Sequence, residues 1–303
     1  CDLVIGMGGG SVIDAAKAVA ALLTNEGDLF TYLEVIGQGQ AISRDPAPCI
    51  AIPTTAGTGA EVTRNSVMQS PEHQVKVSMR SPLMLPRKAV VDPELTLSLS
   101  PALTASTGMD ALTQLLEAFV SRGSNPLTDG ICREGMRRAA RSLERACSHG
   151  NDVSAREDMA VASLFGGLAL ANAKLGAAHG LAAPLGGQYA IPHGVVCARL
   201  LPLVMDANIA ALQQNGAAGE PALKRYTEVA RLVLDDPRAT ADDGVAWAQG
   251  LVDTLKIPGL GDYGFTAKDI GVVVPKGQRA SSMQGNPVVL GPDALTALLE
   301  KAI

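Results

Sequence analysis

The chain has 303 residues, of which 47% are hydrophobic and 18% are charged, so it can bury one large core or two medium-sized cores. Its 25 basic and 30 acidic residues give a net charge of −5 without a basic cluster, which argues against nucleic acid as a partner. The uninterrupted apolar runs fall short of the about 18 residues of a membrane span, and the five cysteines form no CxxC motif, so we expect a cytoplasmic protein without a membrane partner, a disulfide framework or a cysteine zinc site.

In the first third of the chain, short apolar runs typical of buried strands alternate with a helical pattern. The runs expected as strands are Leu3–Ile5, Cys49–Thr55, Lys76–Arg80 and Lys88–Pro93. Between the first two, Ser11–Leu23 carries apolar residues at helical spacing. This alternation predicts an α/β fold with a parallel sheet. The chain enters its first strand directly after Cys1, so we expect further sequence upstream.

Nearly every segment after Leu103 has a helical pattern, and we expect no strand there. The ranges expected as helices are 102–122, 126–148, 153–174, 176–187, 193–213, 221–235, 239–255, 266–275 and 292–302. The character of the sequence changes within DPELTLSLSP, Asp92–Pro101. We therefore predict two domains, an α/β domain over residues 1–97 and an all-helical domain over residues 98–303.

The segment VIGMGGGSVIDAAK has the pattern of a strand, a glycine loop and a helix. Glycines let the backbone approach a phosphate closely, and a helix N-terminus offers free N–H groups to an anion. Ser11 suits the N-cap, with Asp14 three residues later as in a capping box. The strict G-x-G-x-x-G pattern is not met, because Ser11 stands in place of its last glycine. The alternative is a plain tight turn before a capped helix.

The segment PTTAGTGAEVT follows the second expected strand. It offers the hydroxyl groups of Thr54, Thr55 and Thr58 and the flexible backbone of Gly57 and Gly59. A loop at the carboxyl end of a strand in an α/β sheet is well placed to bind a ligand. Because the first glycine loop is expected beside it, we favour a ligand site over a solvated loop.

The helical part carries polar residues whose spacing permits a metal site. Asp110 and Gln114 are one helical turn apart and point the same way, and Glu117 shares their face. His179 and His193 each precede a glycine, and imidazole is a common ligand of zinc and iron. On their own, histidines are more often core or cap groups than ligands, and Asp110 could simply serve the first turn of a helix.

Together the segments resemble the iron-containing alcohol dehydrogenase family, in order and over nearly the whole chain. GMGGGSVIDAAKA and PTTAGTGAEVT resemble its cofactor loops, VVDPELTLSLSP its interdomain hinge, STGMDALTQLLEAFVS and HGLAAPLGGQYAIPHG its metal-binding segments, and GNP a late signature. The resemblance implies a dinucleotide-binding domain, a helical domain and a divalent ion in the cleft between them. It assigns the cofactor, NAD or NADP, to Gly8, Gly9, Gly10, Ser11, Asp14, Thr54, Thr55 and Thr58.

The resemblance also implies the reaction, hydride transfer between the nicotinamide and a small alcohol or aldehyde whose oxygen sits on iron or zinc. Asp110, His179 and His193 fall on catalytic metal-ligand positions. Gln114 falls on the fourth ligand position, where the family usually has a histidine and where an amide is a weaker ligand. Ala183 stands where the family usually has a further histidine near the reacting carbon, and it cannot relay a proton.

These two departures leave three functions open. The first is a metal-assisted NAD(P)-dependent alcohol dehydrogenase or aldehyde reductase. The second is a metal-independent oxo-acid reductase that resembles maleylacetate reductases, and the third is a nucleotide-binding protein without catalytic activity. In each case we expect a small-molecule ligand and a homodimer or larger homo-oligomer.

Overall fold

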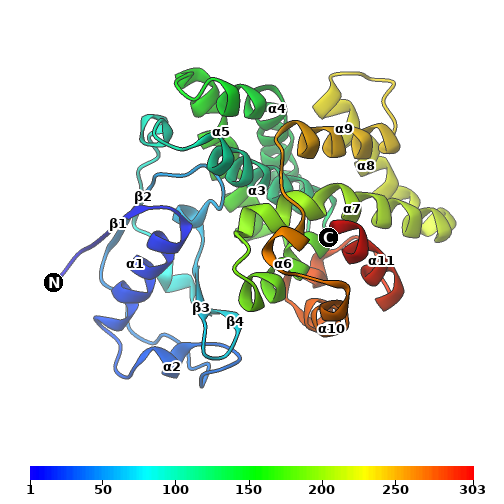
Figure 1. Cartoon of the computed structure of the whole chain (residues 1–303). Coiled ribbons are helices and arrows are strands. Elements are labelled where there is room, and N and C mark those ends of the chain that lie inside the picture. The colour runs from blue at the N-terminus through cyan, green and yellow to red at the C-terminus, as the bar shows by residue number, and fades with distance from the viewer.

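The computed structural model describes the whole chain, Cys1–Ile303. An N-terminal part holds all the strands, and a larger helical part follows it (Figure 1). The strands are β1 (Val4–Gly8), β2 (Cys49–Pro53), β3 (Asn65–Ser70), β4 (Val75–Arg80) and β5 (Lys88–Ala89). The helices are α1 (Gly10–Leu22), α2 (Leu29–Tyr32), α3 (Pro101–Val120), α4 (Pro126–Ser148), α5 (Val153–Asn172), α6 (Ala177–Gln188), α7 (His193–Gln214), α8 (Glu220–Leu234), α9 (Ala241–Thr254), α10 (Ile270–Arg279) and α11 (Pro292–Ala302).

The parallel sheet predicted for the N-terminal part is present, with the strand order β1-β2-β5. β1 and β2 run parallel and in register up to Gly8 opposite Pro53, so both strands end at the same edge of the sheet. α1 packs back on this sheet and buries Ile13 against Ala51. The α/β part followed by helices confirms the predicted fold class.

One strand prediction was wrong in its partner. The strand expected at Lys76–Arg80 does not join the parallel sheet, because β4 pairs antiparallel with β3 in a separate hairpin. The sequence analysis missed β3, whose residues NSVMQS are mostly polar and give no apolar run. Its Ser66 is nevertheless fully buried and donates a hydrogen bond to the backbone oxygen of Asp14, 2.6 Å away. The buried hydroxyl of Ser66 in β3 therefore finds its hydrogen-bond partner in α1, far away in the sequence.

The predicted capping box at the start of α1 was also wrong. The N-cap is Gly9, without a side-chain cap, and Ser11 is an exposed residue in the first turn. The helix begins one residue before the expected start, at Gly10, whose lack of a side chain leaves room for Thr58. A Cβ atom on Gly10 would lie 2.7 Å from Oγ1 of Thr58, which is closer than real contacts allow. The first turn of α1 therefore packs closely against the loop after β2.

Asp14 points into the protein instead of toward the helix start. Its Oδ1 lies 2.7 Å from Nζ of Lys17, and its Oδ2 accepts a hydrogen bond from the N–H of Val67. Lys17, only 1% exposed, also donates to the Ala60 oxygen and the Thr63 hydroxyl. This buried pair fastens α1 to the segment that follows β2.

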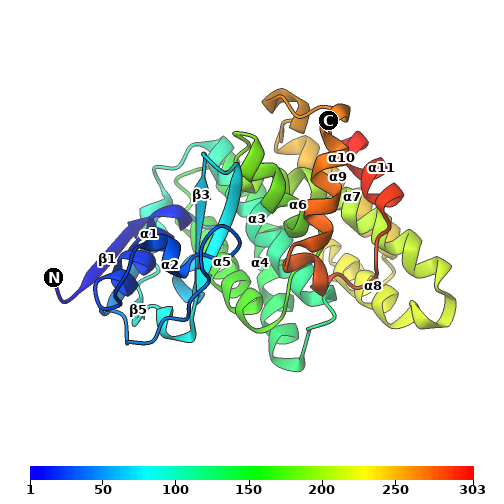
Figure 2. The same cartoon turned by 90° about the horizontal axis from the view of Figure 1, so that it is seen from below.

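The nine helices predicted after Leu103 are all present. The largest shift is at α10, which starts at Ile270 instead of at residue 266, because a short 3₁₀ turn precedes it. A single cluster of 54 buried hydrophobic residues runs through the helices of this part. α3 lies in its middle (Figure 1, Figure 2), and 16 of its 20 residues are buried.

α7 is long and apolar enough to cross a membrane by length and composition. However, 67% of its most apolar window is buried within the protein, as in a core helix. Together, α5 and α6 also pass this test, but they are bent by 97° relative to each other.

The loop after β2 touches the helical part directly. Gly59 has φ 60° in the left-handed region, and a Cβ atom there would lie 2.5 Å from Cα of Gly167 on α5. A Cβ atom on Gly167 would in turn lie 2.3 Å from the oxygen of Gly59. Two facing glycines thus allow backbone to pack on backbone. The division into domains at residues 97 and 98 remains a prediction.

Candidate metal and cofactor site

Four potential metal ligands meet in the helical part: Asp110 from α3, His179 from α6, and His193 and Cys197 from α7. One donor atom from each lies within 4.8 Å of the others. Oδ1 of Asp110 is 3.3 Å from Nε2 of His179 and 3.7 Å from Nε2 of His193. Sγ of Cys197 is 3.6 Å from each of these nitrogens. The fold thus brings together three predicted ligands and adds one that the sequence analysis did not select.

The local structure explains how α7 supplies two of these groups. His193 is the first residue of α7, and Cys197 lies one helical turn later. Residues at i and i+4 share a helix face, so both side chains point at Asp110. The signal in the sequence was the spacing H-x-x-x-C on an expected helix. This spacing differs from the CxxC pattern of cysteine zinc sites, so Cys197 was not among the predicted ligands.

Glu117 holds His179 in place. Its Oε2 lies 2.7 Å from Nδ1 of His179, and the carboxylate also accepts hydrogen bonds from the backbone N–H groups of Ala178 and His179. Because the carboxylate accepts at these atoms, Nδ1 of His179 carries a proton, and Nε2 is the nitrogen that can offer its lone pair to an ion when the ring is neutral. Glu117 is 2% exposed, as expected from its position on the face of Asp110. The start of α6 and the tautomer of His179 are thus fixed by one side chain.

The late GNP motif supports the same helix start. Oδ1 of Asn286 accepts a hydrogen bond from the N–H of Ala177, and its amide donates to Asn208 and to the Val288 oxygen. Asn208 in turn donates to the hydroxyl of Tyr226. These buried amides fix the first turn of α6, where His179 stands. The sequence analysis noted this motif only as part of the resemblance.

Gln114 lies buried one turn from Asp110, but its amide has another partner. Nε2 of Gln114 donates to the backbone oxygen of Gly57, 2.9 Å away, in the loop after β2. This hydrogen bond connects the helix of the candidate metal site with the candidate cofactor loop. The role of Gln114 as a metal ligand remains a prediction.

Burial dominates the electrostatics of the donor cluster. Desolvation lowers the pKa of His193 to about 4 and raises the pKa of the Cys197 thiol to about 12. Burial would also raise the pKa of Asp110, but His193 and His179 outweigh it and lower that pKa. His179 behaves in the opposite sense: burial lowers its pKa, while Cys197, Asp110 and Glu117 raise it well above the usual value. Asp110 therefore keeps its negative charge, and the surroundings of His179 favour a positive charge.

The two candidate cofactor loops lie side by side, as predicted. The N–H of Thr54 donates to the oxygen of Gly8, and Gly10 packs against Thr58 as described above. A Cβ atom on Gly9 would lie 3.5 Å from Thr55. The start of α1 and three half-buried threonines thus face one edge of the sheet. Of the predicted cofactor residues, only Asp14 is turned away from this edge, toward Lys17.

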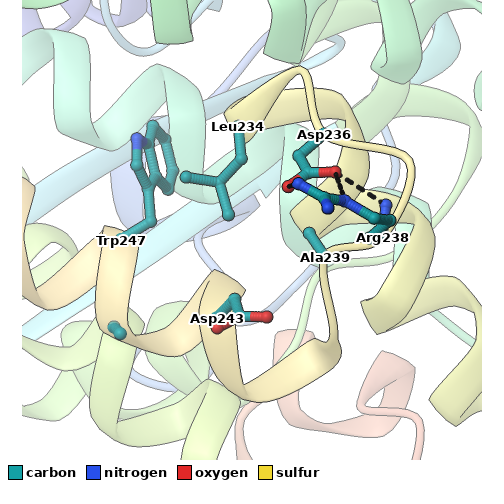
Figure 3. Close-up of a pocket in the computed structure, with 7 residues that line it drawn as sticks. Leu234, Asp236, Arg238, Ala239, Asp243 and Trp247 are labelled. Carbon is teal, nitrogen blue, oxygen red and sulfur yellow. Dashed lines mark hydrogen bonds and ion pairs between the residues drawn. The ribbon is translucent and has the colours of Figure 1, made fainter.

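A separate hollow lies between α8, α9 and their connection (Figure 3). Its polar groups have local partners: Arg238 bonds to Asp236, and Asp243 accepts hydrogen bonds at the start of α9 from Thr240. None of the predicted site residues lines it.

Comparisons with known proteins identify the family to which the chain belongs. The family model described as iron-containing alcohol dehydrogenase matches residues 1–93, and the C-terminal model of the Fe-containing alcohol dehydrogenase family matches residues 104–303. Alcohol dehydrogenase 4 of Saccharomyces cerevisiae is 37% identical over 302 residues, which are 99% of this chain and 76% of that protein. 1,3-Propanediol dehydrogenase of Klebsiella pneumoniae is 43% identical over 70% of this chain and 54% of its own length.

Solved structures show the same relationship. A crystal structure of 1,3-propanediol oxidoreductase superposes with a TM-score of 0.89 at 34% identity, covering 100% of this chain and 77% of that one. Sulfoacetaldehyde reductase from Bifidobacterium kashiwanohense, in complex with NAD+, gives a TM-score of 0.87 at 32% identity, covering 100% and 76%. The chain therefore belongs to the iron-containing alcohol dehydrogenase family and is an oxidoreductase that acts on CH–OH groups.

Proposed function

We propose that this protein transfers hydride between a nicotinamide dinucleotide and a small alcohol or aldehyde, with Asp110, His179 and His193 holding a divalent ion. The observation that carries the proposal is the convergence of these three side chains from three helices. The hydrogen bond from Gln114 to Gly57 joins this cluster to the cofactor loop. The proposal therefore places the metal site and the cofactor site next to each other, where the helical part meets the loop after β2.

The donor set fits a catalytic metal. Two imidazoles and a carboxylate are typical ligands of zinc or iron, and three protein ligands leave a position for substrate. The hydrogen bond from His179 to Glu117 presents the lone pair of Nε2 to the ion. When bound, the ion would act as a Lewis acid toward the substrate oxygen.

The protein's own residues supply positioning. Because burial lowers the pKa of His193, its imidazole is neutral at neutral pH and can act as a ligand. The His193 side chain is 37% exposed, whereas Asp110 is 3% and His179 is 7% exposed. Substrate would thus approach past His193. Alcohol oxidation would move a hydride from the carbinol carbon to the nicotinamide and release the hydroxyl proton to water, because Ala183 cannot accept a proton.

The cofactor is assigned to the edge where β1 and β2 end. We propose that the pyrophosphate lies against the N-terminus of α1 at Gly8, Gly9, Gly10 and Ser11, and that Thr54, Thr55 and Thr58 border it. For Asp14 we propose an indirect role, since it anchors α1 through Lys17.

A panel of aldehydes and oxo-acids, each with NADH and NADPH, tests this function. The assay compares enzyme stripped with a chelator against the same enzyme reloaded with Fe²⁺ or Zn²⁺. We expect aldehyde reduction to disappear on stripping and to return with the ion. Full activity of the metal-free enzyme would contradict the metal role, and turnover of any substrate would exclude a non-catalytic nucleotide-binding protein.

One observation supports the second candidate, an oxo-acid reductase. Lys76 on β4 packs over α6, where a Cβ atom on Gly186 would lie 2.7 Å from its Nζ. Burial lowers the pKa of Lys76, while Cys197 and Asp110 nearby act to raise that pKa. A cation beside the cluster suits an anionic substrate. Lys76→Met should then raise KM for oxo-acids while leaving KM for neutral aldehydes unchanged, and an equal change for both would exclude this role.

Assembly as a homodimer or larger and a cytoplasmic location also remain predictions. Light scattering coupled to size-exclusion chromatography tests the first, and cell fractionation tests the second.

A further inference from the structure

Cys197 is the only member of the donor cluster without a role in the proposed function. Cys197 is fully buried, and its Sγ lies 3.6 Å from Nε2 of both His179 and His193. A buried free cysteine usually packs against apolar side chains and behaves as a small hydrophobic residue. Here the thiol instead faces two imidazole nitrogens and lies within 4.8 Å of a carboxylate oxygen.

The spacing of these atoms matches coordination of one ion. In a tetrahedral zinc site, bonds of about 2.0–2.1 Å to nitrogen and oxygen and about 2.3 Å to sulfur place nitrogen and sulfur about 3.6 Å apart. The same geometry places nitrogen and oxygen about 3.3–3.4 Å apart. The two sulfur–nitrogen distances are 3.6 Å, and the distance from His179 to Asp110 is 3.3 Å. Three of these four edges therefore have the lengths that an ion would impose.

The fourth distance and the hydrogen bonds point the same way. His193 and Asp110 are 3.7 Å apart, wider than a tetrahedral edge, and His193 is the exposed ligand. A fifth ligand, the substrate oxygen, would enter on this side, as zinc sites allow. Nδ1 of His179 donates to Glu117, so Nε2 is the nitrogen left to face the Asp110 oxygen, at a distance that either the Nε2 proton or an ion in its place can bridge.

We propose that Cys197, as a thiolate, is the fourth protein ligand of the ion held by Asp110, His179 and His193. The inference rests on the proposed function, since the ion must be bound there. A sulfur ligand in a set of nitrogen and oxygen atoms favours Zn²⁺ over Fe²⁺.

X-ray absorption of the zinc-loaded wild-type enzyme tests the proposal without a substitution. We expect one sulfur at about 2.3 Å beside nitrogen and oxygen at about 2.0–2.1 Å. In the cobalt-substituted enzyme, we expect a sulfur-to-cobalt charge-transfer band in the near ultraviolet. A shell of nitrogen and oxygen alone, with no such band, would overturn the proposal.

Variants then identify the sulfur. Cys197→Ala should bind zinc at least about 10-fold more weakly, since changes to groups that only support ligands already cost about 10–100-fold. Its cobalt form should keep the visible d–d bands and lose the charge-transfer band. The matched control is Cys132→Ala, at another fully buried cysteine in the core of α4, which should keep both the band and the affinity. A charge-transfer band that persists in Cys197→Ala would refute the assignment.

Gln114→Ala separates the two candidates for the fourth ligand. We expect it to keep the charge-transfer band, and weaker zinc binding in Gln114→Ala together with unchanged binding in Cys197→Ala would also overturn the proposal. Should Cys197→Ala not fold, the absorption spectrum of the wild type decides alone. Catalysis by the metal-free enzyme would contradict the proposed function, whereas an ion bound without sulfur contradicts only the role of Cys197.

Discussion

Glu117→Gln examines how one buried carboxylate supports the candidate metal site. In the structure, this carboxylate accepts hydrogen bonds from Nδ1 of His179 and from two backbone N–H groups at the start of α6. Glutamine has nearly the same shape but only one acceptor oxygen, and its NH₂ group would face a donor. The substitution therefore removes the charge and leaves at least one donor unsatisfied.

The expected magnitude follows from these contacts. A hydrogen bond to a charged group contributes about 1.5–3 kcal/mol, so the metal-free variant should lose about that much of its free energy of unfolding. Metal binding should weaken by about 10–100-fold, because His179 loses the partner that fixes its tautomer and orientation. This loss corresponds to about 1.4–2.8 kcal/mol of binding free energy.

Two measurements check these values. Urea unfolding followed by circular dichroism gives the stability of the metal-free protein, and competition with a chromogenic chelator gives the zinc affinity. Glu134→Gln is the matched control, since Glu134 forms a partly exposed ion pair with Arg138 on α4. It should change stability by at most about 1 kcal/mol and leave zinc affinity unchanged. If Glu117→Gln bound zinc as tightly as the wild type, the proposed support of His179 would be wrong.

Three further predictions concern the framework around the site. Lys17→Met leaves Asp14 buried without its cation and should cost about 3–5 kcal/mol in urea unfolding; a loss below 1 kcal/mol would show that the pair is dispensable. Gly167→Ala places a Cβ atom 2.3 Å from the oxygen of Gly59, so it should destabilise the protein and weaken cofactor binding in titration calorimetry, whereas unchanged binding would separate α5 from the cofactor loop. Burial tends to raise the pKa of Asp158, but hydrogen bonds and charges from neighbouring arginine and serine residues lower it overall. Its stabilisation should therefore be complete above the unfolded pKa of about 3.9 and disappear as pH falls through the lower folded pKa; Asp158→Asn should flatten this dependence in acid unfolding, and an unchanged slope would contradict the assignment.

The elements that sequence predicted well are those with strong local signals. The helices at 126–148 and 292–302 were predicted to the residue, because proline at the first position and apolar residues at helical spacing mark them. β3 was missed because its residues are polar, and its burial depends on Asp14 of α1. The predicted start of α1 was one residue late, and the contact between Gly10 and Thr58 at its first turn joins segments 48 positions apart in the sequence.

The site divides in the same way. Asp110, His179 and His193 were selected from the family resemblance, and the fold places them together. Cys197 was not selected; its H-x-x-x-C spacing places it on the face of His193, but only the fold shows that this face meets Asp110. The hydrogen bond from Gln114 to Gly57 was equally hidden, since it crosses from the helical part to the loop after β2.

The sequence by itself determined the family, the α/β part followed by nine helices, and three of the four donor residues, because these depend on motifs and periodicity along the chain. The tertiary structure alone decided the partner of β4, the inward turn of Asp14, the tautomer of His179 and the presence of Cys197 beside two histidines. The physical reason is that each of these depends on atoms brought within hydrogen-bonding or coordination distance by the packing of separate elements, and local sequence does not encode such distances.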